Sequence, residues 1–148
     1  MEYETKITVK PIFWDRAPNV LVMMNGKIID DIKTFEKSNH STVLSYKLNL
    51  KEHNRLQICL QNKTNDQTVQ ENGKIIKDQY LILEDLEIDK VVLQPAMLLK
   101  GTFQPLYPSN LQQQDLPKQL HTTQFNFNGI YSLDFTMQIH VWFFQNLD

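Results

Sequence analysis

The sequence predicts an all-β protein, an antiparallel β-sandwich of the jelly-roll type. Apolar and polar residues alternate strictly in several segments, three of the four glycines follow an asparagine, and no segment combines a clear helical period with a cap. A period of two is typical of a strand with one face on the core and the other on solvent. Closely spaced strands without intervening helices indicate a sandwich or jelly roll.

Alternation is clearest over residues 43–50, 55–61 and 132–141, and we expect each segment to be a half-buried antiparallel strand. In the last segment, one face would carry Leu133, Phe135, Met137, Ile139 and Val141. Segment 78–93 is rich in β-branched and aromatic residues, so we expect one long bent strand or two short ones there.

Asparagine–glycine pairs mark the turns between these strands. Asn-Gly tolerates the positive φ angles of a type I′ turn, whose twist suits a hairpin. The pair at 25–26 would join strands 20–24 and 27–29, and the pair at 128–129 would lead into the C-terminal strand. A third pair lies at 72–73.

The chain of 148 residues is expected to form one domain. Four of its six prolines fall between residues 95 and 124. Proline is confined to the edges of sheets, so we expect a long proline-containing loop at about 95–124. Loops of this length are usually functional or disordered.

Charge and motifs exclude several classes of function. A net charge of −2 gives no electrostatic basis for binding nucleic acid or an anionic membrane surface. No apolar run reaches the roughly 20 residues of a transmembrane helix, and the polar start predicts no secretory signal. The lone Cys59 excludes an intrachain disulfide. No nucleophile elbow, phosphate loop or metal-spaced histidine pair is present, so we expect no enzyme.

One polar segment, residues 61–80, carries the oxygen-rich side chains that calcium prefers. Asn62, Asp66 and Asp78 are the candidate metal ligands, should the loop fold back on itself. The alternative is a solvated polar turn that needs no ion, and four lysines flank the segment and oppose a cation.

Aromatic residues supply the candidate contacts with a partner. Residues 101–148 contain one basic and three acidic residues but nine of the 15 aromatic residues, a composition typical of interface cores. Neighbours on a strand point to opposite faces, so at least one of residues 142–144 would face away from the core. The alternative is that these aromatic residues fill the sandwich core. The candidates for contact with a partner or a glycan are Trp14, Tyr107, Trp142, Phe143 and Phe144.

The middle of the chain resembles two known groups of proteins. The matching runs are ICLQNK at 58–63, Asp66 with Thr68-Val69, GKIIKDQYLIL at 73–83 and LEID at 86–89. They resemble the calcium-dependent, xylan-binding type of carbohydrate-binding module. They also resemble small virion-associated proteins of contractile-tailed bacteriophages, which share the aromatic-rich end seen here at 127–135 and 139–147.

The resemblance implies a β-sandwich of the carbohydrate-binding-module type. It places Asn62 and Asp78 on ion-binding positions, and Lys63 where the modules have an aspartate, so that a positive charge replaces a ligand. The phage group implies a non-enzymatic docking protein of the virion tail, neck or head, assembled in the host cytoplasm. Its partners would be other virion proteins or copies of itself. The alternative is a carbohydrate-binding module for adhesion to glycans, with calcium as its one candidate cofactor.

Overall fold

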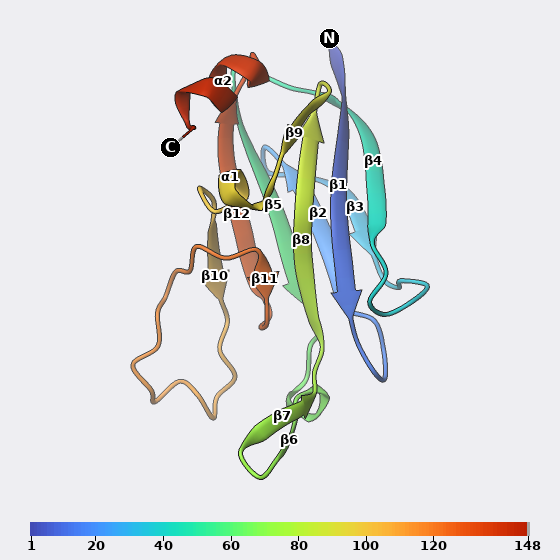
Figure 1. Cartoon of the computed structure of the whole chain (residues 1–148), viewed down its shortest axis with the longest axis vertical. Helices are drawn as coiled ribbons and strands as arrows, with labels where there is room; N and C mark the ends of the chain where they lie inside the picture. The colour runs from blue at the N-terminus through green and yellow to red at the C-terminus, as the bar shows by residue number, and fades with distance from the viewer. Residues whose placement is uncertain (148) are drawn as a thin grey trace.

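The computed structural model describes residues 1–147, which form two antiparallel β-sheets packed face to face and a separate hairpin (Figure 1). The first sheet has the order β11-β8-β1-β4, with β9 paired to β8, and the second has the order β10-β12-β5-β2-β3. The hairpin consists of β6 and β7. The predicted antiparallel β-sandwich is therefore confirmed. The strands are β1 (Glu2–Ile12), β2 (Asn19–Met24), β3 (Lys27–Ile32), β4 (Thr42–Asn49), β5 (His53–Gln61), β6 (Val69–Glu71), β7 (Lys74–Lys77), β8 (Tyr80–Ile88), β9 (Val91–Leu93), β10 (Thr102–Pro105), β11 (Gln124–Phe125) and β12 (Gly129–Thr136).

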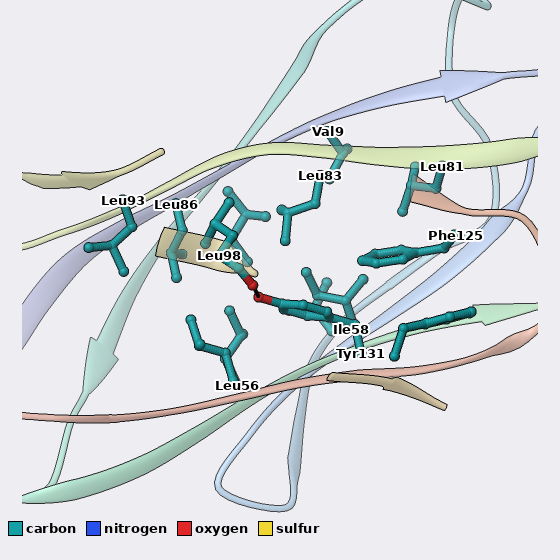
Figure 2. Packing of buried hydrophobic residues seen from close by; sticks show 14 of the residues in the cluster. Val9, Leu56, Ile58, Leu81, Leu83, Leu86, Leu93, Leu98, Phe125 and Tyr131 are labelled. Carbon is teal, nitrogen blue, oxygen red and sulfur yellow. Dashed lines mark hydrogen bonds between the residues drawn. The ribbon is translucent and has the colours of Figure 1, made fainter. Parts of the chain in front are cut away.

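The core lies between the two sheets, where alternate side chains of the central strands meet (Figure 2). In the second sheet, Tyr131 pairs with Ile58 across the β12–β5 ladder. The Phe125 ring stacks on the Tyr131 ring at 5.2 Å between centroids. The buried Tyr131 hydroxyl donates a hydrogen bond of 2.6 Å to the carbonyl of Leu98. The polar tip of this core tyrosine is thus satisfied without water.

Two of the three expected turns have the predicted geometry. Asn25 and Asn72 adopt φ angles of 55° and 54°, and the glycine after each is also left-handed, as a type I′ turn requires. The pair at 128–129 leads into β12 as expected but does not form such a turn. A Cβ atom on Gly129 would lie 2.3 Å from the carbonyl oxygen of Gln104, so close approach to β10 explains this glycine.

Segments 78–93 and 95–124 each divide into helices and strands differently from what the sequence predicts. Segment 78–93 forms a long strand, β8, and a short strand, β9, so it is neither the single long strand nor the two short strands that were expected. The expected loop at 95–124 contains the short helix α1 (Pro95–Leu98) and β10, and it ends at the first residue of β11, so its long irregular part is 106–123. Pro105 ends β10, which is an edge strand, as the missing backbone N–H requires.

The predicted C-terminal strand through Val141 is wrong beyond Thr136. There β12 reaches its last pairing, with His53 at the start of β5, and no strand is left for it to pair with. Helix α2 (Ile139–Gln145) follows, burying Ile139 and Trp142 three residues apart and leaving Phe144 exposed. Ile139 and Val141 fit a period of two, but Ile139 and Trp142 also fit a helical spacing, so the alternation could not exclude a helix. No helix among residues 1–147 has the length and apolar character to cross a membrane.

Candidate functional site

A cleft of about 700 Å³ opens between the β6–β7 hairpin and the 106–123 loop. Both segments project from one end of the sandwich, and α2 lies at the other end (Figure 1). Segment 124–128, which begins in β11 and leads into β12, completes the lining. This volume lies within the range of about 300–1,000 Å³ that is usual for small-molecule sites.

The lining of the cleft is unusually rich in groups that both donate and accept hydrogen bonds. Six side-chain amides line it, from Asn65, Gln70, Asn110, Gln124, Asn126 and Asn128. Three hydroxyls join them, from Thr64, Thr68 and Ser109, and apolar surface comes chiefly from Ile75, Leu106, Leu111 and Phe127. An amide presents two donors and an acceptor, so the cleft suits a ligand covered with hydroxyl groups.

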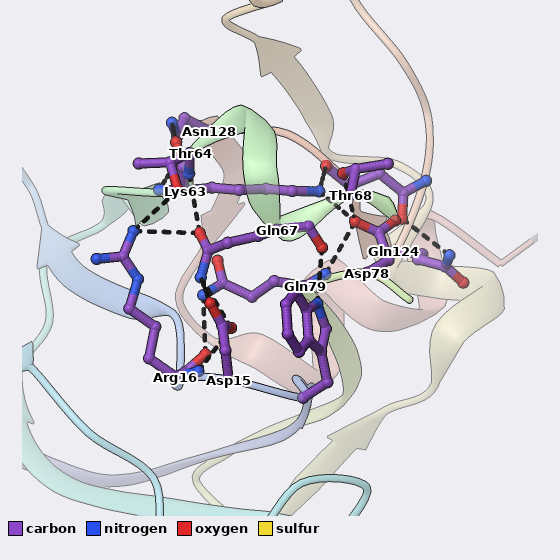
Figure 3. Close-up of polar contacts among 12 residues, drawn as sticks. Asp15, Arg16, Lys63, Thr64, Gln67, Thr68, Asp78, Gln79, Gln124 and Asn128 are labelled. Atoms are coloured by element: carbon purple, nitrogen blue, oxygen red, sulfur yellow. Dashed lines mark hydrogen bonds and ion pairs between the residues drawn. The ribbon is translucent and has the colours of Figure 1, made fainter. Parts of the chain in front are cut away.

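Lys63 and Asp78 form an ion pair in this cleft. The Lys63 ammonium lies 2.8 Å from Oδ1 of Asp78, and the two side chains are only 9% and 15% exposed (Figure 3). The ammonium also donates to the carbonyl oxygen of Asn126 at 2.5 Å. Oδ1 of Asp78 further accepts hydrogen bonds from the Thr68 hydroxyl at 2.7 Å and the Gln79 N–H at 2.8 Å. Oδ1 of Asp78 therefore has three partners within the protein itself.

Asn128 fixes the backbone of Lys63. The Lys63 N–H donates to Oδ1 of Asn128 at 2.9 Å, and Nδ2 of Asn128 donates to the Lys63 carbonyl at 3.0 Å. Asn62, which precedes the lysine, has a φ angle of 64° and reverses the chain as it leaves β5. The backbone that carries the Lys63 side chain is thus held by two hydrogen bonds to the turn before β12.

A buried glutamine anchors the loop after β5 to the rest of the sandwich. Gln67 is fully buried, and its Oε1 accepts a hydrogen bond of 2.8 Å from the Thr64 N–H. The Gln67 carbonyl accepts a hydrogen bond of 2.9 Å from the Trp14 indole. Because the backbone and the side chain of Gln67 both form hydrogen bonds, the loop after β5, which forms one wall of the cleft, is held in a defined position.

The structure does not gather the three predicted metal ligands into one site. Asp78 alone of the three lines the cleft, where it is bound to Lys63. Asp66 lies on the short 3-10 helix Asn65–Gln67 and accepts a hydrogen bond from the Thr64 hydroxyl. The Asn62 carbonyl accepts a hydrogen bond from Arg16 at 2.9 Å. No cluster of three or more His, Cys, Asp or Glu residues that could hold a metal occurs within residues 1–147.

These residues do not fit a calcium ion. Calcium takes six to eight oxygen ligands, and carboxylates supply most of the charge that holds it. The one carboxylate in the lining, Asp78, already neutralises the Lys63 ammonium. A divalent cation at this carboxylate would be repelled by that ammonium at short range.

None of the five predicted aromatic contact residues lines the cleft. Trp142, Phe143 and Phe144 lie together on α2, where the Phe143 and Phe144 ring centroids are 5.7 Å apart, whereas Trp14 and Tyr107 lie elsewhere. One face of Trp14 is covered by the Lys77 ammonium, 4.7 Å from the ring centroid. The Tyr107 hydroxyl donates across the long loop to the Pro117 carbonyl at 2.6 Å. Trp142 is 7% exposed and belongs to the core. Phe143 is half-buried on α2, whereas Phe144 is 70% exposed.

Sequence reasoning missed the amides that line the cleft. They come from residues 65–70, from residue 110 and from residues 124–128, which are far apart along the chain. The abundance of asparagine and glutamine in these segments was the only available signal. Nothing in the sequence indicated that they share one end of the sandwich.

Two comparisons with known proteins give no match: no family model matches the chain, and no curated protein does. Solved structures do match. The fold is similar to that of a calcium-dependent carbohydrate-binding module. The module vCBM60, from one of two calcium-dependent families linked by circular permutation, has a TM-score of 0.54 and 7% identity over 88% of each chain. vCBM60 in complex with galactobiose has a TM-score of 0.52 and 8% identity over 87% of this chain and 95% of that one. At such low identity the likeness shows the fold, and it confirms the predicted module-like sandwich.

Proposed function

We propose that the protein is a non-catalytic glycan-binding module and that the cleft between the β6–β7 hairpin and the 106–123 loop is its binding site. The observation that carries this proposal is the set of six amides and three hydroxyls in one cleft. Some of these groups bond to one another or to the ion pair, but the side chains of Asn65, Gln70, Asn110 and Ser109 have no hydrogen-bond partner within residues 1–147 and are available to a ligand. Its setting, on a fold similar to that of carbohydrate-binding modules, supports the same conclusion.

The chemistry of the cleft suits a sugar on two counts. Sugar hydroxyls can exchange hydrogen bonds with the amides, each worth about 0.5–1.5 kcal/mol net. The C–H faces of a sugar ring can pack on Leu106, Leu111 and Phe127. A few such contacts give a binding free energy of about −4 kcal/mol or better, which corresponds to a millimolar or tighter Kd.

The charges in the cleft support a role in binding and not in catalysis. Glycoside hydrolysis by the common routes needs two carboxyl groups flanking the scissile bond. Among the residues that line the cleft, Asp78 is the only carboxylate, and it is paired with Lys63. We therefore assign the cleft a role in adhesion to glycans.

Titration with neutral disaccharides, beginning with the galactobiose seen in the vCBM60 complex, tests this proposal. Asn65, Gln70 and Asn110 are exposed in the cleft lining, so their alanine variants should fold normally. Each should weaken binding about twofold to tenfold. Asn49→Ala, an exposed amide on β4, is the matched control and should leave the affinity unchanged. Equal affinity in all four variants would place the glycan elsewhere.

A second candidate function is docking to another protein, which the exposed apolar residues at and beyond α2 favour. The resemblance of the sequence to virion-associated proteins makes a bacteriophage particle the setting that we propose for it. On α2, Phe144 is 70% exposed and Val141 is 45% exposed, and Leu147 just beyond the helix is 48% exposed. A groove of about 430 Å³ lies between α1 and α2. We propose virion proteins or a second copy of this chain as its partners. Sedimentation of the wild-type protein and of Phe144→Ser tests self-association: an unaltered monomer in both would exclude docking between copies.

A further inference from the structure

We infer that the Lys63 ammonium is a built-in cation of the glycan site, so that the protein binds neutral glycans without calcium. The inference deepens the proposed function and rests on it where it concerns the ligand. The part that concerns calcium rests on the ion pair alone and is tested without any glycan.

The ammonium does what a structural cation would do, because it links three separate segments that build the cleft. Lys63 comes from the turn after β5, Asp78 from the residues before β8, and Asn126 from the link between β11 and β12. Its partners are a carboxylate oxygen at 2.8 Å and a backbone carbonyl oxygen at 2.5 Å, which are the kinds of oxygen that a calcium ion would bind. The Phe127 ring, 5.9 Å away at its centroid, is a further favourable neighbour for a positive charge.

One donor of the ammonium remains for a ligand. A lysine ammonium carries three N–H donors, and the Asp78 carboxylate and the Asn126 carbonyl take two of them. Lys63 is itself part of the cleft lining. The third donor can therefore reach a sugar hydroxyl in the cleft, and a charged donor makes a stronger hydrogen bond than a neutral amide does.

The same ion pair sets the class of glycan. Lys63 and Asp78 are the only charged residues in the cleft lining, and together they carry no net charge. An acidic sugar would bring a carboxylate into a cleft whose single cation is already neutralised. Galactobiose is neutral, whereas digalacturonic acid has a carboxylate on each ring in place of the hydroxymethyl group. The affinities for these two probes therefore measure the preference for neutral over acidic glycans.

Thermal unfolding of the full chain in calcium chloride and in EDTA tests the built-in cation. The wild-type Tm should be the same in both, and a rise in calcium would overturn the inference. Lys63→Met removes the charge and keeps most of the side-chain volume, leaving the Asp78 carboxylate without its ammonium. We expect a fall in Tm of about 5–10 °C in both solutions, because breaking a mostly buried ion pair is costly. Lys47→Met, at an exposed lysine of β4, is the control, and an equal Tm in the two variants would also overturn the inference.

Titration of the wild-type protein tests the ligand. Galactobiose should bind with the same Kd in calcium and in EDTA, and at least tenfold more tightly than digalacturonic acid. A tenfold loss of galactobiose affinity in EDTA, or tighter binding of the acid, would contradict the inference. Should neither disaccharide bind, the glycan half fails together with the proposed function, while the unfolding experiment still decides on the cation.

Discussion

Replacing Asn128 with alanine removes both hydrogen bonds that hold the backbone of Lys63. In the wild-type protein the Asn128 amide bonds to the Lys63 N–H at 2.9 Å and to the Lys63 carbonyl at 3.0 Å. The variant leaves a donor and an acceptor without these partners at the partly buried end of β5. The Lys63 ammonium then loses its fixed position opposite Asp78.

The size of the effect follows from these two bonds. Each neutral hydrogen bond contributes about 0.5–1.5 kcal/mol net to stability, so the pair is worth about 1–3 kcal/mol. For a domain of about 150 residues, each kcal/mol shifts Tm by about 2–4 °C. We therefore expect Asn128→Ala to lower Tm by about 2–12 °C, and to weaken glycan binding as the cleft loses its order.

Thermal unfolding followed by circular dichroism measures the change, with Asn49→Ala on the surface of β4 as the matched control. Asn128→Asp gives a graded comparison, because it keeps an acceptor for the Lys63 N–H but loses the donor to the Lys63 carbonyl. It should fall between the wild-type protein and Asn128→Ala. A Tm for Asn128→Ala within 1 °C of that of Asn49→Ala would refute the reasoning.

Three further predictions concern other parts of the sandwich. Gly129→Ala places a Cβ atom 2.3 Å from the Gln104 carbonyl oxygen and should lower the free energy of unfolding, measured in urea, by about 1–3 kcal/mol. An unchanged free energy would show that β10 can shift away from β12 at no cost. The hydrogen bond from Arg55 lowers the pKa of Asp134, so this pair stabilises the fold above the unfolded pKa of about 4 and the effect disappears as pH falls through the lower folded value. Asp134→Asn should therefore cost less than about 1 kcal/mol at pH 7, and the cost should shrink as the pH is lowered through the folded pKa; a cost that does not change on acidification would contradict the pairing. Burial raises the pKa of the Cys59 thiol, so a thiol reagent at pH 8 should react slowly with the native protein and rapidly in urea; rapid native labelling would contradict the burial.

The sequence carried enough information for the fold class because burial on one face of a strand imposes a period of two. That signal located β4, β5 and β12, and the Asn-Gly pairs located two hairpins. It failed at Ile139–Gln145, where the apolar residues fit a helical spacing (Ile139 and Trp142) as well as a period of two (Ile139 and Val141). Strand β12 ends at Thr136 because its partner β5 begins at His53. This limit depends on which strands pair, so it cannot be predicted from the sequence of the segment itself.

The site could be predicted only in part, for a related reason. Asp78 was identified in the sequence from its position before a strand. Lys63 was identified from the resemblance, as a positive charge at a position where the carbohydrate-binding modules have an ion-binding aspartate. Their ion pair depends on the chain reversal at Asn62 and on the two bonds from Asn128, 65 residues further along the chain. The amides of the cleft gather because two hairpin-like segments leave the sandwich at the same end (Figure 1), which requires the strand order.

Chemical-shift mapping of the backbone amides during titration with a panel of neutral disaccharides, galactobiose among them, tests the glycan site most directly. We expect at least one member of the panel to shift residues 63–70, 106–111 and 124–128 while α2 and the outer strands stay unchanged. Saturation at millimolar concentration with shifts confined to those three segments would establish the cleft as the binding site. Shifts clustered on α2, or no shifts at all across the panel, would contradict it.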